Sequence, residues 1–307
     1  MMHAATIIGC CGGFGRAFIE LLRRHGFDLR GADVLPTTQR PDGIAEYVQA
    51  DARSCDWHAL GAAEPGRLIL LCVPQDIVIA SFDRLLPTLG QDTLAADIVS
   101  VKSRVADAFA SHRTAGQYVS LHPMFGPSAD LRGRNVASVP LGDGPLVAEL
   151  EAMLRSEGAT VTRMTADEHD RGVAVTQVLV HAALLSFGLA SRDASVPATT
   201  VAALGTPVHR VLESLLARLC AGEPSLYAHI QRDNRHAADA RRLLRAALDR
   251  LDAAARHDAS VLETLIGTAQ AAPVAKTPIG APQDASVLET PVGTAHAAPV
   301  PETPIGA

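Results

Sequence analysis

A glycine-rich loop near the beginning of the chain constrains its fold more than any other feature. An apolar run at residues 5–8 is followed directly by Gly9-Cys-Cys-Gly12-Gly13-Phe14-Gly15, and a helical pattern follows the loop. Glycines allow a tight turn and a close approach of the backbone to a phosphate, while the N-terminus of the next helix offers free N–H groups. This order of strand, loop and helix predicts the first unit of a doubly wound α/β domain with a dinucleotide site.

Short apolar runs recur through the first half of the chain. We expect strands at residues 28–33, 68–73, 94–99 and 118–121, with helices between them. Strands that alternate with helices form a parallel sheet, so residues 1–164 are predicted to be an N-terminal Rossmann-type domain with a doubly wound parallel sheet. The residues expected to bind its cofactor lie in the glycine loop and at the end of the strand at 68–73: Gly9, Gly12, Gly13, Phe14, Gly15, Val73 and Pro74.

An acidic residue, Asp33, ends the second expected strand, 18 residues after Gly15. A carboxylate at this place can accept hydrogen bonds from the adenosine ribose hydroxyls and would repel a 2′-phosphate. The sequence therefore favours NAD over NADP as the cofactor. Arg30 precedes Asp33 on the same strand, and its positive charge keeps NADP open as an alternative.

The second half of the chain has helical patterns only. Thr165-Ala-Asp-Glu168 is the signature of a capping box, which begins a helix. We expect this helix to run to about residue 190, further helices near 208–220 and 225–256, and no strand after about residue 163. Residues 165–256 are thus predicted to be an all-helical substrate domain. Its helices are apolar on more than one face, which predicts a homodimer.

The last fifty residues or so have a different composition. Residues 258–281 and 284–307 are one unit of 24 residues written twice, with five differences. The unit is rich in Ala, Pro, Thr and Gly and has no aromatic residue, and two copies are too few to build a solenoid core. We therefore expect residues 257–307 to be a disordered tail, with a partner-binding tail as the alternative.

Composition excludes several classes of protein. Apolar residues make up 48% of the chain and the net charge is −6, which fits a globular protein and disfavours one that coats nucleic acid. The five cysteines are scattered without a CxxC pair, so we expect neither a disulfide framework nor a metal site. There is no signal-peptide pattern, and polar residues interrupt the apolar stretch at 173–190, so we expect a cytoplasmic protein in which that stretch is a buried helix and no membrane partner.

Four segments downstream of the loop carry chemistry-bearing residues in a specific order. They are Val99-Ser100-Val101-Lys102, the run from Leu121-His122 to Gly126-Pro127, Gln177-Val-Leu-Val-His181, and the stretch from Arg210 through Arg218 to Tyr227. Together with the loop they resemble the prephenate dehydrogenase family of aromatic amino-acid biosynthesis, over roughly residues 5–250. The chain is identified as a member of that family on these motifs.

The resemblance implies an NAD-dependent oxidative decarboxylation of a cyclohexadienyl substrate. A hydride leaves C4 of the ring for the nicotinamide while the ring carboxylate departs as CO₂. Some members of the family oxidise 4-amino-4-deoxyprephenate to 4-aminophenylpyruvate and supply p-aminophenylalanine to antibiotic pathways, and we favour this substrate slightly. The alternative is prephenate, which is oxidised to 4-hydroxyphenylpyruvate in tyrosine biosynthesis. A remote alternative is a non-catalytic NAD-sensing regulator, which the presence of His122 and Arg218 disfavours.

Three residues are candidates for catalysis. His122 is expected at the end of a parallel strand, where a neutral imidazole can accept the proton of the 4-substituent. Ser100 also ends a strand and could hydrogen-bond both His122 and the 4-substituent, or cap a helix. Lys102 is the one lysine before the tail, in a chain where arginine is the usual cation. It is expected either to hold the nicotinamide and substrate together or to be a structural cation.

The family pattern also implies a set of substrate-binding residues. Arg218 is expected to grip a substrate carboxylate, and Arg210, two helical turns earlier, is the weaker candidate. Gln177 and His181 are four residues apart, so they share one helix face, which lines the cleft in the family. Tyr227 matches a family tyrosine near the substrate.

Three positions depart from the family pattern. Cys10 stands in place of a glycine, and with Cys11 it is expected to be a small packing residue. His209 stands where a tyrosine is expected, and Val180 replaces a more polar residue. The changes at His209 and Val180 fall where discrimination between substrates could arise.

Overall fold

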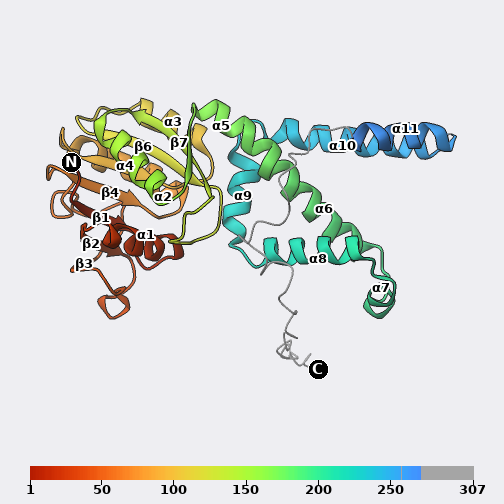
Figure 1. Cartoon of the computed structure of the whole chain (residues 1–307), viewed down its shortest axis with the longest axis horizontal. Helices are drawn as coiled ribbons and strands as arrows, with labels where there is room; N and C mark the ends of the chain where they lie inside the picture. Colours follow the sequence, from red (N-terminus) through yellow and green to blue (C-terminus); the bar gives the residue numbers. More distant parts are fainter. Residues whose placement is uncertain (257, 271–307) are drawn as a thin grey trace, which may run out of the picture.

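The structure, a computed structural model, describes residues 1–256 and 258–270. An α/β domain forms one end of the molecule and a group of helices forms the other (Figure 1). A single eight-stranded sheet has the strand order β3-β2-β1-β4-β5-β6-β7-β8. All neighbouring strands are parallel except β6 and β7. The Rossmann-type sheet expected from the sequence is confirmed.

The strands are β1 (Ala4–Ile8), β2 (Asp28–Asp33), β3 (Glu46–Gln49), β4 (Arg67–Leu71), β5 (Leu94–Asp97), β6 (Gln117–Pro123), β7 (Asn135–Gly142) and β8 (Thr160–Arg163). The helices of this domain are α1 (Gly13–Arg24), η1 (Thr37–Gln39), α2 (Gln75–Leu85), η2 (Leu86–Thr88), α3 (Lys102–Ala110) and α4 (Pro145–Ser156). The sequence did not indicate β3, β7 or β8. Strands β3 and β8 have four residues each and are mostly exposed, and β7 contains a proline, so none has the long apolar run of a buried strand.

Two hydrophobic cores lie on the two faces of the sheet. One joins the apolar sides of α1 and α4 to the strands, through residues such as Leu22 and Leu150. The other joins α2 and α3 to the opposite face, around Phe82 and Tyr118, whose rings meet edge to face at 5.4 Å. Helices cover both faces of the sheet. Such folds bind ligands at the carboxyl edge of the sheet, where the carboxyl ends of the parallel strands lie.

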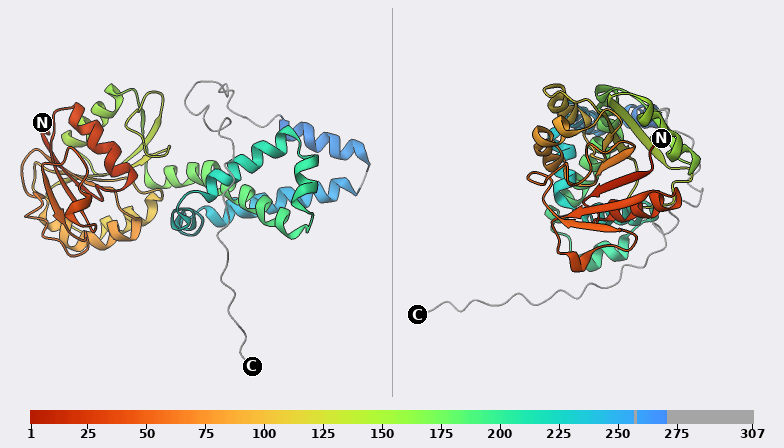
Figure 2. Two further views of the ribbon diagram at one scale, coloured as in Figure 1. Left: turned by 90° about the horizontal axis from the view of Figure 1, so that it is seen from below. Right: turned by 90° about the vertical axis from the view of Figure 1, so that its left-hand side faces the viewer.

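The helical part begins at residue 166 and has no strand in the described residues. Its elements are α5 (Ala166–Val173), the π-helical η3 (Ala174–Leu179), α6 (Val180–Asp193), α7 (Ala198–Leu204), α8 (Pro207–Cys220), α9 (Pro224–Asp233), α10 (Ala237–Ala255) and α11 (Ala259–Gln270). The capping box is present: Thr165 accepts from the N–H of Glu168, and Glu168 accepts from the N–H of Thr165. Helices α5, η3 and α6 follow one another directly as the long helix that the sequence predicts, and α8 and α9 lie on one side of it (Figures 1 and 2).

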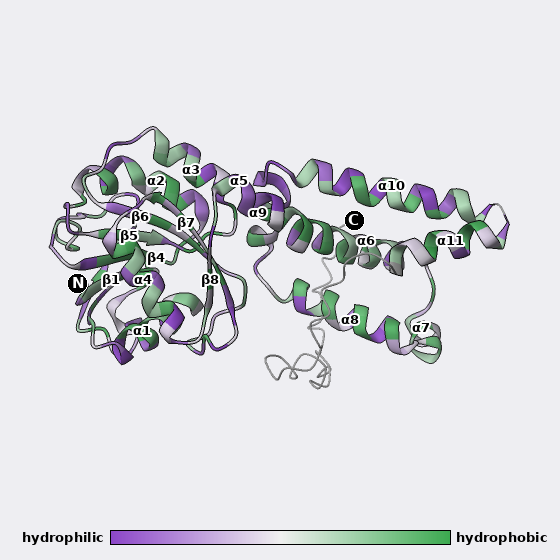
Figure 3. Cartoon of the chain, turned by 45° about the horizontal axis from the view of Figure 1, so that its top comes forward, coloured by the Kyte–Doolittle hydropathy of each residue, from purple (hydrophilic) through white to green (hydrophobic). Residues whose placement is uncertain are grey.

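The expectation that the apolar stretch at 173–190 is a buried helix holds in the single chain only for its first part, where Val173, Ala174 and Val178 are buried. No residue of α6 is buried, and Leu189 is 54% exposed. The helical run Ala166–Asp193 contains a stretch of 18 residues with a mean hydropathy of 1.9, so by length and composition alone it could cross a membrane. Exposed apolar side chains also lie on α8, at Val208, Val211 and Leu215, and hydrophobic residues recur along its ribbon (Figure 3). The physical reason for the difference is that the helices of one chain are too few to cover an apolar face of this width.

The tail also differs in part from the expectation. Residues Ala259–Gln270, the first half of the first repeat, form α11, which folds back against α10. Their sequence contains no proline, and the prolines begin only at Pro273, so nothing in it interrupts a helix. The predicted disorder of residues 271–307 lies outside the described residues.

Candidate active site

Four of the predicted segments meet at the carboxyl edge of the parallel strands. The glycine loop follows β1, Val73 and Pro74 follow β4, Ser100 follows β5, and His122 lies near the end of β6. Since β1, β4, β5 and β6 are neighbours in the sheet and run parallel, their ends lie side by side. The strand order reverses between β1 and β4, which is the usual position of a dinucleotide in an open α/β sheet.

The glycines of the loop are required by close packing. Gly9 has φ +77°, and a Cβ there would collide with the backbone carbonyl of Cys72. A Cβ on Gly15 would collide with the carbonyl of Gly9. Gly12 caps α1 without a side chain, so the first N–H groups of the helix have no side-chain cap. Backbone of this kind can form a cradle for phosphate groups.

The segment after β6 packs on the glycine loop. The ring centroids of Phe14 and Phe125 lie 6.3 Å apart, and a Cβ on Gly13 would lie 2.8 Å from Cγ of Pro127. The two motifs are more than a hundred residues apart in the sequence, and nothing in either motif indicates this contact. It brings the segment after His122 against the start of α1.

Asp33 lies beside the loop at the end of β2. It is 9% exposed, its Oδ2 accepts from the N–H of Cys11 at 3.0 Å, and its Oδ1 accepts from the N–H of Leu35 at 3.2 Å. Arg30 is held elsewhere, because its Nε donates to Glu46 at 2.7 Å. A carboxylate next to the phosphate cradle, with the nearby arginine paired, fits NAD better than NADP.

Two cysteines share this place with Asp33. The Sγ atoms of Cys10 and Cys11 and a carboxylate oxygen of Asp33 all lie within 4.8 Å of one another, which is close enough to hold a metal ion. Burial and the neighbouring Cys11 and Asp33 raise the pKa of Cys10 to about 12, so its thiol is protonated. The absence of a metal stays a prediction.

Lys102 is fully buried at the start of α3. Its Nζ donates to the carbonyl of Val99 at 2.6 Å, to Oγ of Ser120 at 2.7 Å and to the carbonyl of Leu121 at 2.6 Å. Nζ also lies 3.6 Å from Oδ1 of Asp97. These contacts use all three protons of the ammonium group. Of the two roles that the sequence leaves open, the geometry favours the structural cation over direct contact with a substrate.

His122 is 4% exposed and belongs to a chain of buried polar groups that the sequence did not indicate. Its Nδ1 lies 2.9 Å from Nε2 of His169, and Nδ1 of His169 lies 2.8 Å from Oδ1 of Asp170. Burial lowers the pKa of His122 well below its ordinary value, and the charge of Lys102 and the neighbouring His169 lower it further. The imidazole of His122 is therefore neutral, as a proton acceptor must be.

Ser100 follows β5 and is half-buried, one residue before Val101, which caps α3. The sequence suggested a hydrogen bond to His122 or a role as the helix cap. Neither occurs in the described residues: Nδ1 of His122 pairs with His169, and Val101 is the N-cap of α3. A contact of Ser100 with the 4-substituent stays a prediction.

Three of the predicted substrate residues gather on the helical side. Gln177 lies in the π-helical η3 and His181 in the first turn of α6, and the rings of His181 and Tyr227 meet edge to face at 5.2 Å. Oε1 of Gln177 and Nδ1 of His181 are buried and have no hydrogen-bond partner among the described residues. Buried polar atoms without partners are costly, and π-helical turns are frequent at functional sites. This arrangement is what a polar ligand in contact with both side chains would require.

The two arginines of α8 lie at different ends of the helix. Arg218 is in the last turn, next to the connection to α9, which lies beside the α/β domain (Figure 1). Arg210 is exposed and lies about 12 Å farther along the axis, toward α7 and away from the sheet. His209 is also at that end, where its ring packs on Phe187 at 5.9 Å. Within one chain, the structure does not bring Arg210 and His209 to the carboxyl edge of the sheet.

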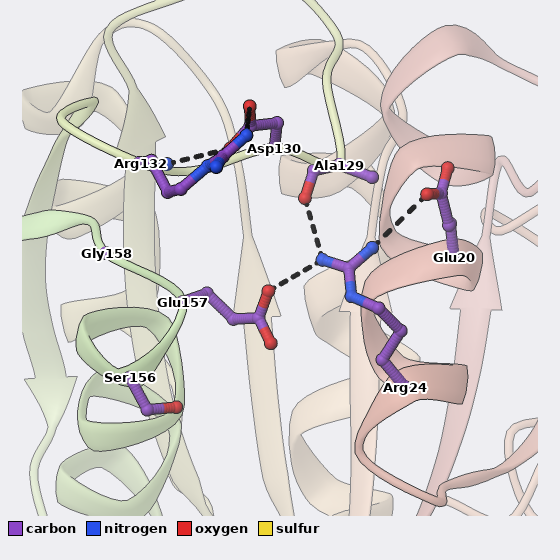
Figure 4. A pocket seen from close by; sticks show the side chains of 8 residues that line it. All are labelled: Glu20, Arg24, Ala129, Asp130, Arg132, Ser156, Glu157 and Gly158. Carbon is purple, nitrogen blue, oxygen red and sulfur yellow. Dashed lines mark hydrogen bonds and ion pairs between the residues drawn. The ribbon is translucent and has the colours of Figure 1, made fainter.

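A pocket of about 480 Å³ lies away from these residues, between the ends of α1 and α4 and the loop after β6 (Figure 4). Its charged side chains are paired with one another: Arg24 donates to Glu20, to Glu157 and to the carbonyl of Ala129. None of the predicted site residues lines it. This pocket is not the active site.

Comparison with known proteins identifies the family. The family model "Prephenate dehydrogenase, nucleotide-binding domain" matches residues 20–148, and "Prephenate dehydrogenase, dimerization domain" matches residues 165–266. The 4-amino-4-deoxyprephenate dehydrogenase of Streptomyces pristinaespiralis is 35% identical over 246 residues, which are 80% of this chain and 82% of that protein. The chain belongs to the prephenate dehydrogenase family.

Two further proteins related to the prephenate dehydrogenase family are less similar in sequence. The T-protein of Enterobacter agglomerans is 30% identical over 75% of this chain, which spans 56% of the T-protein. The crystal structure of prephenate dehydrogenase from Aquifex aeolicus, solved with hydroxyphenyl propionate and NAD⁺, shares the fold. Its TM-score is 0.70 at 19% identity, over 88% of this chain and 96% of that one. As a prephenate dehydrogenase family member, the chain is an oxidoreductase whose helical part corresponds to the family's dimerization domain.

Proposed function

We infer that the chain is an NAD-dependent dehydrogenase that converts 4-amino-4-deoxyprephenate into 4-aminophenylpyruvate and CO₂. The observation that carries the reaction class is the neutral, buried His122 at the carboxyl edge of the sheet, beside the phosphate cradle of the glycine loop. The observation that favours the amino substrate is the 35% identity with an enzyme of that name. The product would supply p-aminophenylalanine and antibiotic precursors.

The residues that would hold NAD are those of the cradle. Gly9, Gly12, Gly13, Phe14 and Gly15 would receive the pyrophosphate, Asp33 the adenosine ribose, and Val73 and Pro74 would border the cofactor after β4. When bound, NAD supplies the acceptor for the hydride. The protein must then orient the ring of the substrate and stabilise the positive charge that develops at its 4-substituent.

The chemistry balances with His122 as a temporary proton acceptor. The C4–H bond breaks with its electron pair leaving as hydride, and the bond from the ring to its carboxylate breaks to release CO₂. The electron pair of that second bond enters the ring, which becomes aromatic. Positive charge develops on the 4-amino nitrogen as the hydride leaves, and His122 accepts a proton from it. The proton returns to the nitrogen as the electron pair of the lost carboxylate reaches it, so no proton is released overall. A base in this position contributes about 10²–10⁴-fold to the rate.

The substrate carboxylates need a cation to pair with, and the substrate ring needs side chains that pack against it. We assign a carboxylate to Arg218, whose guanidinium can bind it through two parallel hydrogen bonds. The buried, unpartnered atoms of Gln177 and His181 would receive further polar groups of the substrate, with Tyr227 packed behind His181. Arg210 stays a weaker candidate because it lies toward the other end of α8.

The substrate assignment is tested by measuring kcat/KM for both substrates with NAD. A larger value for 4-amino-4-deoxyprephenate supports the proposal, while a larger value for prephenate identifies a tyrosine-pathway enzyme. No turnover of either substrate, with NAD still bound, would leave the NAD-sensing regulator. A pH profile adds a second readout: if the amino group must bind uncharged, its own ionisation remains visible in the profile of the His122→Asn variant.

We also propose that the chain works as a homodimer, which rests on the family's dimerization domain and on the uncovered apolar surface. Exposed apolar side chains lie along the helices of the second half: Val180 and Leu189 on α6, Val208, Val211 and Leu215 on α8, and Leu243, Leu248 and Leu251 on α10. In a dimer these faces would cover one another, which accounts for α6 without membrane insertion.

Sedimentation velocity of the full chain tests the dimer. We expect a dimer at micromolar concentration, and dissociation by Leu189→Arg. Val48→Arg is the matched control, because Val48 is 39% exposed on the edge strand β3 of the other domain. A monomeric wild-type chain would refute the proposal. A cytoplasmic location is part of the same proposal and predicts recovery in the soluble fraction of lysed cells.

A further inference from the structure

The polar chain behind His122 begins at Asp170, which is fully buried in α5. Its Oδ1 accepts from the N–H of Lys102 at 2.9 Å, and its Oδ2 accepts from the N–H of Ser103 at 2.9 Å and from the Ser103 hydroxyl. These donors are in the first turn of α3, where N–H groups lack helical partners and the helix dipole is positive. Burial alone would raise the pKa of Asp170, but these hydrogen bonds and the one from His169 lower it. Asp170 is therefore an ionised carboxylate, which only accepts hydrogen bonds.

The ionised Asp170 fixes which ring nitrogen of His169 carries a proton, and His169 in turn fixes the tautomer of His122. Nδ1 of His169 lies 2.8 Å from Oδ1 of Asp170, so Nδ1 must carry a proton and donate it. Burial lowers the pKa of His169, which keeps the ring neutral with a single N–H. Its Nε2 is then an acceptor, and the atom that faces it at 2.9 Å is Nδ1 of His122. His122 consequently carries its proton on Nδ1.

The opposite arrangement is unfavourable. A proton on Nε2 of His169 would direct the lone pair of its Nδ1 at the carboxylate of Asp170, unless the ring were cationic. A cationic His169 is disfavoured by its burial and by the charge of Lys102, although Asp170 and Asp97 oppose this. Only one orientation of the two hydrogen bonds therefore satisfies all three side chains.

We propose that His169 and Asp170 are positioning residues that hold His122 in the tautomer protonated on Nδ1, so that Nε2 is the atom that accepts the proton of the substrate. In the described residues Nε2 of His122 has no hydrogen-bond partner, as a base awaiting its substrate requires. The role in catalysis rests on the function proposed above, whereas the tautomer itself does not. The arrangement has the logic of a catalytic triad, in which a carboxylate fixes the tautomer of the base through one ring nitrogen.

The tautomer is measured directly by ¹⁵N NMR of the full chain labelled at histidine. The signals of His122 are identified by their loss in His122→Asn. We expect Nδ1 of His122 to have the shift of a protonated nitrogen and Nε2 that of an unprotonated one. Replacing His169 by Phe removes the acceptor and should move His122 toward the Nε2-protonated tautomer. An Nε2-protonated or doubly protonated His122 in the wild-type chain would overturn the proposal, as would an unchanged tautomer in His169→Phe.

Kinetics distinguish positioning from a merely structural role. His169→Phe should lower kcat by about 10²–10⁴-fold with KM within a few-fold, because the wrong tautomer affects the proton transfer and not the binding. His169→Gln should recover part of kcat, since its amide oxygen can accept from Nδ1 of His122 and its NH₂ can donate to Asp170. If His169→Phe does not fold, His169→Gln and the wild-type spectrum still decide the question.

A control and one further outcome complete the test. His112→Gln should leave kcat and the His122 signals unchanged, because His112 pairs with Asp83 at 2.9 Å at the far end of α3. If His169→Gln raises KM and lowers kcat together while the His122 tautomer stays unchanged, His169 acts on the fold only. If the tautomer is as expected but His122→Asn keeps full activity, the proposed function fails and the tautomer assignment stands.

Discussion

Nη1 of Arg104 lies 2.8 Å from Oδ2 of Asp233 and joins α3 of the sheet domain to the last turn of α9. The same oxygen accepts from Nε2 of Gln75 at 3.1 Å and faces Nδ1 of His229 at 2.7 Å. The side chain of Asp233 is 6% exposed, so this is a buried carboxylate that gathers donors from both parts of the molecule. It fixes α9 relative to the N-terminal ends of α2 and α3, close to the carboxyl edge of the sheet.

Replacing Asp233 by Asn should lower the free energy of unfolding by about 1.5–3 kcal/mol at pH 7, the usual size for hydrogen bonds to a buried charge. Burial opposes ionisation, but hydrogen bonds from Arg232, His229 and Arg104 hold the pKa of Asp233 well below its ordinary value. A lowered pKa stabilises the fold above the unfolded value of about 3.9 and loses that effect as the pH falls further. Urea unfolding should show the two proteins converging below about pH 4.

The exposed Asp239 is the control for this prediction. It pairs with Arg242 on the surface of α10 at 3.1 Å, and Asp239→Asn should change stability by less than about 0.5 kcal/mol. Equal effects of the two substitutions would mean that the contact between the domains contributes nothing specific.

Replacing His122 by Asn should lower kcat by about 10²–10⁴-fold and change KM by only a few-fold. The interaction with the proton grows as C4 is oxidised, so it is stronger in the transition state than in the bound substrate. In the wild-type enzyme the low pKa of His122 means that its protonation should not lower kcat/KM between neutral pH and about 6.5. A near-normal kcat in the variant would remove His122 from the mechanism.

Replacing Arg218 by Gln should act mainly on KM, which should rise by about 10- to 150-fold. The carboxylate is gripped in the ground state as well as in the transition state, and a charge-assisted hydrogen bond is worth about 1.5–3 kcal/mol. Arg210→Gln is the matched control on the same helix and should change KM much less. A larger effect at Arg210 would reverse the assignment and would require a second chain to bring that end of α8 to the site.

Replacing Asp33 by Ser should raise KM for NAD by about 10- to 150-fold and improve the use of NADP relative to NAD, because the lost contact is to a charged acceptor. Arg30→Gln should leave the preference unchanged, since Arg30 is engaged with Glu46 and Glu64. The ratio of kcat/KM with NAD to kcat/KM with NADP measures the cofactor preference of each variant. A switch in preference caused by Arg30→Gln alone would contradict the assignment.

Replacing Lys102 by Met should destabilise the fold by about 3–5 kcal/mol, because it leaves the buried Asp97 without its cation. Burial lowers the pKa of Lys102 to about 8, and Asp97 and Asp170 oppose that shift, so the side chain is charged at neutral pH. Urea unfolding measures the effect. A stable variant with a specific loss of kcat would instead show that Lys102 contacts the substrate.

The sequence alone determined those features whose cause is local. The strand, glycine loop and helix at residues 4–24 follow one another directly, and the glycines are needed because neighbouring backbone leaves no room for a Cβ. The capping box of Thr165 and Glu168 spans four residues and was found in the same way. His122 and Ser100 were singled out by the family motifs and, like Asp33, by their places at strand ends, which share one edge in a parallel sheet.

Only the tertiary structure decided which groups meet across the chain. His169 and Asp170 follow the capping box and have the pattern of ordinary helix residues, yet the packing of α5 against α3 brings them to His122, 47 residues away in the sequence. The same packing buries Lys102. The helices of one chain are too few to cover α6, which therefore has no buried residue. Hydrogen bonds of 2.8–2.9 Å depend on the relative position of whole helices and strands, and no local periodicity encodes that position.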